Sequence, residues 1–238
     1  MVNKALPEEL VVAAREAVEA HTRLTLAAYG KSPDPEFRAL LEVGKGWEKA
    51  PTDWTGPSFG LRQRRGWIKG LGSGQMFADF NPAAVAAVRA HLRGFIACLH
   101  GVPPSSLRAE PDKASIKCAG CPALPLHIDK NRLGSYQVVV ALSSTSFVTV
   151  LGSHKQTYGG AKKGYYELSK EEAQELEIMS EEVTPGTVLV MEGGTCVHGS
   201  PAVKAGEPRI AMYVHYSVAK TDSVAAIVPA AAAGLRDQ

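Results

Sequence analysis

Apolar residues recur at helical spacing in two segments of the first hundred residues. Between Pro7 and His21 they fall three or four positions apart, which predicts an amphipathic helix. A stronger stripe follows Asn81-Pro82, where proline at the first helical position marks a start, and it ends near Gly101. The members of this stripe are Val85, Val88, Leu92, Phe95, Ile96 and Leu99. Each helix therefore has an apolar face to bury against another layer.

From Ser115 onward the apolar residues form short runs separated by Gly, Ser and Pro, which is typical of strands. The runs lie at 136–142, 147–151, 187–191 and 210–217. Between them, Ser169 followed by Glu172 is the signature of a capping box and predicts a short helix reaching about Met179. Regular short strands with turn signals indicate a sandwich or jelly roll, with the helices bracing one outer sheet. The predicted class is therefore mixed α/β with a mainly β core.

The length of 238 residues and the hydrophobic content of 45% allow a substantial buried core. We expect one domain over 1–238. Within it, 1–112 is a mostly helical support region, 113–217 is the core and 218–238 is a tail.

Charge and cysteine content exclude several classes of protein. A net charge of +2 and a pI of 8.3 are too mild for a nucleic-acid footprint. Residues 1–21 contain acidic residues and no apolar h-region, and no run is long enough to span a membrane. Four cysteines are too few for a secreted disulfide scaffold, so we expect reduced thiols. An intracellular, soluble protein, most simply cytoplasmic and without a membrane partner, is the expectation.

Two histidines and a carboxylate form the main candidate site. His127 and Asp129 are two positions apart, so a strand would aim both side chains at one ion. A lone His-x-Asp is usually an ordinary structural pair, but His198-Gly199-Ser200 in a second apolar run supplies a third ligand. Two histidines and one carboxylate without a thiolate suit non-haem Fe(II) better than zinc and leave coordination positions open.

The spacing of these residues resembles a known family. His127-x-Asp129, then His198-x-Ser200, then Arg209 eleven residues after His198 is similar to the pattern of the phytanoyl-CoA dioxygenase-like Fe(II)/2-oxoglutarate oxygenases. The resemblance covers residues 113 to 217 and includes Val150 to Lys155, which is similar to the family's P-G-S-H turn. It departs from the family at Leu151, where proline is usual.

The resemblance implies a double-stranded β-helix (jelly-roll or cupin-like) braced by the amino-terminal helices. It implies a dioxygenase that uses Fe(II), 2-oxoglutarate and O2, with ascorbate as a reductant, and has His127, Asp129 and His198 as metal-binding and catalytic residues. The implied reaction hydroxylates a C–H bond of a small molecule and releases succinate and CO2. Because related halogenases lack the carboxylate, Asp129 favours hydroxylation over halogenation. Desaturation or ring closure would use the same ligands.

Five residues are candidates for binding the cosubstrate. Arg209 would pair bidentately with the far carboxylate of 2-oxoglutarate, and Ser200 would donate to the same group. The alternative for Arg209 is a surface hairpin cap. Lys117 resembles a lysine that faces the cosubstrate in some members, but a solvated surface lysine fits equally. Either Tyr136 or Gln137 must point inward and could donate to the C1 carboxylate, with packing the stronger expectation for Tyr136.

Other features leave the substrate open. The basic run Arg62 to Lys69 could grip phosphates of CoA or nucleic acid, although a charged strand edge is the commoner role. Cys118 and Cys121 give only half a tetrahedral zinc site and are interpreted as a loop. For His154 we expect a structural hydrogen-bonding role, whereas His215 shares strand parity with Arg209 and could line the pocket, with packing the stronger expectation. A nucleic-acid base oxygenase, a peptide hydroxylase and a non-catalytic binding protein remain alternatives to the small-molecule enzyme.

Overall fold

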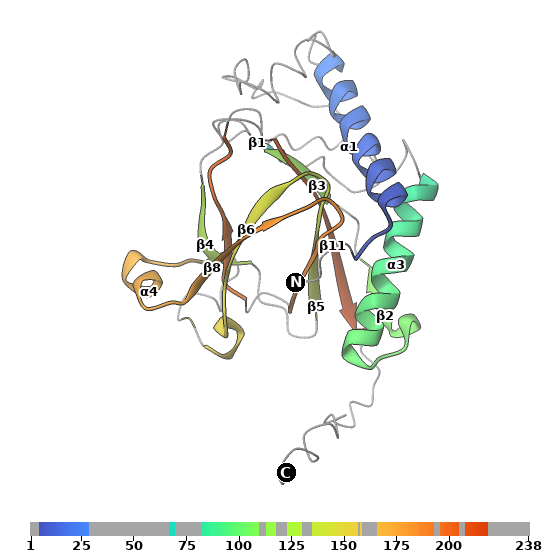
Figure 1. The fold of residues 1–238 in the computed structure, drawn as a ribbon. Helices are drawn as coiled ribbons and strands as arrows, with labels where there is room; N and C mark the ends of the chain where they lie inside the picture. Colours follow the sequence, from blue (N-terminus) through green and yellow to red (C-terminus); the bar gives the residue numbers. More distant parts are fainter. Residues whose placement is uncertain are drawn as a thin grey trace.

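The computed structural model describes residues 5–28, 67–69, 82–109, 113–117, 123–129, 135–156, 158, 166–192, 196–204 and 208–218 (Figure 1). Three sequence predictions fall outside these ranges: the Cys118 to Cys121 loop, residues 62–66 of the basic run, and the tail after residue 218. The single-domain division stays a prediction.

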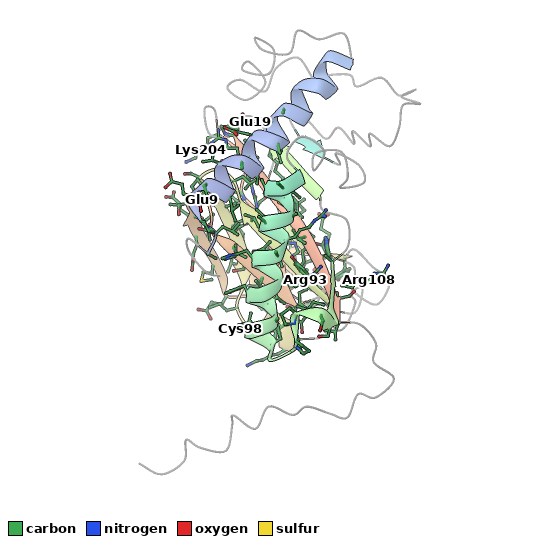
Figure 2. All side chains as sticks on the ribbon, turned by 90° about the vertical axis from the view of Figure 1, so that its right-hand side faces the viewer. Glu9, Glu19, Arg93, Cys98, Arg108 and Lys204 are labelled. Atoms are coloured by element: carbon green, nitrogen blue, oxygen red, sulfur yellow. The ribbon has the colours of Figure 1, made fainter. Side chains whose placement is uncertain are left out.

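Two helices form an outer layer on one side of the protein. Helix α1 (Glu8–Ala28) begins where predicted but continues further, and α3 (Pro82–His100) matches its predicted span. Figure 2 looks onto these two helices, with the strands behind them. Their buried side chains share one cluster with Ile210, Met212 and Val214 of the sheet beneath. In the described part of the chain, no helix is long and apolar enough to cross a membrane.

The described strands form two antiparallel sheets. The larger sheet has the order β1 (Trp67–Lys69), β3 (Lys113–Lys117), β11 (Arg209–Val218), β5 (Ser135–Ala141) and β9 (Val188–Glu192), with β2 (Leu107–Ala109) also on β11. The smaller sheet has the order β7 (Tyr166–Glu167), β4 (Leu124–Ile128), β10 (His198–Ser200), β6 (Thr145–Val150) and β8 (Ile178–Val183). Short helical turns η1 (Pro104–Ser106), η2 (Ser153–Lys155) and α4 (Lys170–Gln174) complete the described elements.

Alternation along the strands separates a helix-facing core from an inter-sheet core. On β11, Ile210 and Met212 face the helices, whereas Ala211 packs between the sheets with Val139 of β5 and Phe147 of β6. Both faces of the larger sheet are therefore buried. Two packed antiparallel sheets with an external helical layer confirm the predicted double-stranded β-helix.

The predicted helix from Ser169 to Met179 is only partly correct. The capping box is present, with the Ser169 side chain accepting from the Glu172 backbone, but α4 ends at Gln174. Strand β8 then starts at Ile178 and pairs with β6 from Val150 onward. The start of the helix follows from a local signal, whereas its end is decided by pairing with a strand distant in sequence.

Candidate functional site

The three predicted metal ligands lie together on the inner face of the smaller sheet. His127 of β4 and His198 of β10 are direct cross-strand partners, and their ring centroids are 4.3 Å apart. Asp129 follows β4, with Oδ1 3.6 Å from His127 Nε2 and Oδ2 3.5 Å from His198 Nε2. One ligand atom from each residue lies within 4.8 Å of the other two. The geometry suits one shared ion.

Both imidazoles are oriented by backbone carbonyls two residues earlier. His127 Nδ1 lies 2.8 Å from the Pro125 carbonyl oxygen, and His198 Nδ1 lies 3.1 Å from the Cys196 carbonyl oxygen. A carbonyl only accepts, so each Nδ1 must carry a hydrogen, and a ring that has no proton on Nε2 presents a lone pair there. Those lone pairs face the Asp129 carboxylate, an arrangement that is repulsive unless a cation lies among them. The donor set therefore fits a metal ion.

The protonation states of His127 and Asp129 also favour metal binding. Burial, followed by the charge of His198, lowers the pKa of His127 to about 4, so its imidazole is neutral at neutral pH. Burial alone would raise the pKa of Asp129, but interaction with His198 and the nearby imidazole charges hold it below its ordinary range. The triad thus presents one anion and an uncharged His127 imidazole, as ligation requires.

The lowered pKa of His127 predicts a pH-dependent stability of the metal-free protein. The ordinary value is 6.5 and the folded value about 4, so the unfolded chain takes up the proton first as the pH falls. We expect the free energy of unfolding to fall by about 2 kcal/mol between roughly pH 7 and pH 5 through this group. Urea unfolding of the apoprotein at both pH values measures the effect. His127→Gln should remove this component, and identical pH slopes in the two proteins would contradict the prediction.

Gly199 explains why glycine separates the second histidine from Ser200. A Cβ atom at this position would lie 2.8 Å from the Leu124 carbonyl oxygen and 3.3 Å from that of Pro125, both in the backbone of β4. The pairing register between β10 and β4 also shifts between His198 and Ser200. The close approach of the two ligand-bearing strands therefore requires a residue without a side chain.

Gly199→Ala should consequently weaken metal binding although it changes no ligand. The added methyl group meets backbone oxygens, which cannot rotate away, so β10 must move relative to β4 and separate His198 from His127. We expect about a 10-fold or larger loss of Co(II) affinity, comparable to losses at residues that support metal ligands. Calorimetric titration of Co(II) measures it. Gly94→Ala is the matched control, because a Cβ there meets open space on α3. Equal effects of the two alanines would refute this role of Gly199.

A buried cationic cluster lies next to the triad. Ser200 is two residues after His198 on β10 and accepts a hydrogen bond of 2.9 Å from Lys117 Nζ of β3. Lys117 pairs directly across the strands with Arg209, the first residue of β11. Lys117, Ser200 and Arg209 are exposed by only 2%, 3% and 6%. The surface lysine and the hairpin cap, the alternatives for Lys117 and Arg209, are therefore wrong. Two buried cations beside a hydroxyl donor suit an anionic ligand such as a carboxylate.

The two cosubstrate candidates on β5, Tyr136 and Gln137, lie on opposite faces of the strand. Tyr136 belongs to the core beneath the helices, where its ring centroid lies 4.0 Å from that of His100. The structure thus does not bring Tyr136 to the site, because alternation on β5 directs it to the helical layer. Gln137 lies on the inter-sheet face and forms a side-chain hydrogen bond with Asp129. It is also the cross-strand partner of half-buried His215, which shares the inward parity of Arg209.

One supporting residue was missed in the G-S-H turn. His154, given a structural hydrogen-bonding role from sequence, is exposed, whereas Ser153 is 1% exposed and its Oγ accepts from the backbone N–H of Val197 at 2.9 Å. Val197 directly precedes His198, so this bond fixes the start of β10. The similarity of this turn to the family's pattern identified the segment from sequence. It did not show that Ser153, rather than His154, forms the supporting hydrogen bond. Of the described cysteines, Cys98 is exposed (Figure 2) and Cys196 is half-buried.

Fold and site together define a double-stranded β-helix in which two histidines and one carboxylate could hold a metal ion. AviO1 from Streptomyces viridochromogenes Tue57 has a similar structure, with a TM-score of 0.59 and 17% identity over 90% of this chain and 86% of AviO1. SnoK, a non-heme alpha ketoglutarate dependent carbocyclase from nogalamycin biosynthesis, gives 0.50 and 18% identity over 60% of this chain and 62% of SnoK. No protein-family model and no curated protein matches the chain. These likenesses show a shared fold.

Proposed function

We propose that this protein is an Fe(II)- and 2-oxoglutarate-dependent dioxygenase that hydroxylates a C–H bond of a small molecule. The observation that carries the proposal is the convergence of His127, Asp129 and His198 within 4.8 Å. A buried cationic cluster lies next to them, around Ser200, which is two residues after His198 on β10. A metal triad alone fits many chemistries. A triad beside a carboxylate-binding site fits a metal-chelating dicarboxylate.

Each residue has a defined task in the proposed reaction. His127, Asp129 and His198 would hold the metal on one face, and their backbone-bonded Nδ1 atoms keep the Nε2 atoms aimed at it. Arg209, Lys117 and Ser200 would bind and orient the far carboxylate of the cosubstrate. Iron with 2-oxoglutarate, when bound, supplies the activation of O2 for substrate oxidation, with release of succinate and CO2. Burial of the cationic cluster excludes water from the charged contact and strengthens it.

The small-molecule substrate is supported by the likeness to SnoK, whose substrate chemistry belongs to nogalamycin biosynthesis. That likeness also supports a second candidate, in which the same oxidation ends in ring closure. The remaining alternatives are a nucleic-acid substrate and a peptide substrate. Product structure distinguishes hydroxylation, which adds one oxygen atom, from cyclisation, which removes two hydrogens.

The test is anaerobic reconstitution of the purified protein with Fe(II), followed by titration of 2-oxoglutarate. We expect a visible metal-to-ligand charge-transfer band that saturates, and succinate formation once O2 is admitted. Screening polar small molecules for accelerated succinate release then identifies substrates, with short oligonucleotides and peptides as parallel arms. A protein that binds Fe(II) and gives neither band nor succinate would overturn the proposal and favour a non-catalytic member of the fold.

A further inference from the structure

An aromatic ring covers the guanidinium of Arg209. The Arg209 Cζ atom lies 4.6 Å from the centroid of the Phe147 ring, within the range of a cation–π contact. Phe147 belongs to β6 of the smaller sheet and Arg209 to β11 of the larger one, so the contact bridges the sheets. Phe147 is 3% exposed and Arg209 6%. Both partners are thus largely removed from water, where such a contact is strongest.

Phe147 is itself held firmly in place. It packs in the inter-sheet core with Val183 of β8, Leu189 of β9 and Ala211 of β11. Residues of both sheets therefore surround the ring, and close packing allows it little freedom. A guanidinium resting on a fixed ring has its own orientation restricted, while the N–H groups at its edge remain directed in the guanidinium plane.

The metal triad and the cationic cluster need a fixed relation to each other, because a chelating cosubstrate touches both at once. Lys117 bonds to Ser200 and is thereby tied to the strand of His198. Arg209 is the cross-strand neighbour of Lys117, and its guanidinium contacts the Phe147 ring of the smaller sheet. The ring therefore supplies a surface that sets the orientation of the arginine relative to the metal ligands.

We propose that Phe147 is a positioning residue for the cosubstrate, acting through Arg209 by fixing the plane in which its guanidinium meets the far carboxylate. This inference rests on the proposed function. Phe147 would contact neither metal nor reacting atoms, so its removal should alter cosubstrate affinity and leave metal affinity unchanged. A purely structural phenylalanine would instead affect both affinities or neither.

The experiment measures two constants in full-length wild type and Phe147→Leu: Co(II) affinity by calorimetry without cosubstrate, and 2-oxoglutarate affinity from the anaerobic charge-transfer band with Fe(II). We expect the 2-oxoglutarate Kd to rise by about 10- to 30-fold, the value of a desolvated cation–π contact, with Co(II) affinity within about 2-fold of wild type. Val183→Ala is the control, since it removes buried packing from the same core and keeps the ring. Phe147→Met, which conserves more volume, replaces the leucine variant if that protein does not fold.

A double-mutant cycle with Arg209→Lys shows whether the ring acts through the arginine. If it does, Phe147→Leu should cost clearly less in the Arg209→Lys background than in wild type. Fully additive effects, or an unchanged 2-oxoglutarate Kd in Phe147→Leu and Phe147→Met, would overturn the inference while the proposed function stands. Absence of any 2-oxoglutarate binding in wild type would overturn the proposed function, and this inference with it.

Discussion

Asp129→Ala should abolish metal binding and turnover while the two sheets remain folded. The carboxylate is the anionic member of the triad and lies 3.5 and 3.6 Å from the two Nε2 atoms. Mutation of a residue that only supports a metal ligand typically lowers metal affinity by about 10- to 100-fold, so removal of a ligand itself should lower it by more than about 100-fold. Asp129 follows the end of β4 and belongs to none of the described apolar clusters. Its loss therefore leaves core packing in place.

Calorimetric titration of Co(II) and succinate formation measure the Asp129→Ala effect, and thermal unfolding verifies the fold. Glu167→Ala is a matched control. Glu167 is also a carboxylate on the neighbouring strand, directly across from His127, but it is exposed and is not part of the triad. We expect near wild-type metal affinity for Glu167→Ala. Equal metal occupancy in Asp129→Ala and wild type would disprove the site assignment.

The convergence of the three candidate ligands could be predicted from sequence because their positions depend on strand geometry. His127 and Asp129 are two residues apart near the end of β4, and alternation places both on one face. The direct pairing of His127 with His198 depends instead on the register of two strands about seventy residues apart in the chain. The combined motif with Ser200 and Arg209 indicated that His198 joins the other two residues, but no local propensity encodes the strand pairing.

Two expectations show where local reasoning fails. Tyr136 and Gln137 are adjacent on a strand buried on both sides, so hydrophobicity could not tell which one faces the inter-sheet space. The helical layer decides it by covering the face of Tyr136. Likewise, the ring of Phe147 meets Arg209 only because two sheets pack face to face. An alternating apolar pattern identifies a buried phenylalanine but not its partner in the opposite sheet.

The burial of Lys117 could not be predicted from sequence because a lysine is normally a surface residue. Lys117 is only 2% exposed, and the free-energy cost of burying its side chain is partly offset by the hydrogen bond to Ser200, a residue 83 positions away in the chain. With Arg209 opposite, the cluster concentrates positive charge at one end of the inter-sheet space. Such a concentration in a buried setting favours binding of an anion, and it makes the loss of either cation a test of cosubstrate recognition.

Arg209→Ala should retain metal binding and lose cosubstrate affinity. Arg209 is only 6% exposed, so its pairing with a carboxylate would take place away from water. Truncation of one partner in such a buried pair costs about 2 to 5 kcal/mol. We expect the lower part of that range, because Lys117 remains as a second cation next to the same position. Arg209→Lys should recover affinity only in part, since an ammonium cannot form a bidentate fork.

Titration of 2-oxoglutarate into the anaerobic Fe(II) protein, followed by the charge-transfer band, measures the affinity of each Arg209 variant. Arg108→Ala is the matched control, because Arg108 is an exposed arginine on β2, which pairs with β11. It removes the same charge from the same sheet at a solvent-exposed position, so its titration curve should match that of wild type. If Arg209→Ala also gives the wild-type curve, Arg209 does not bind the cosubstrate. The buried cations would then serve another anion, and the protein would belong to another class of metal-dependent enzyme.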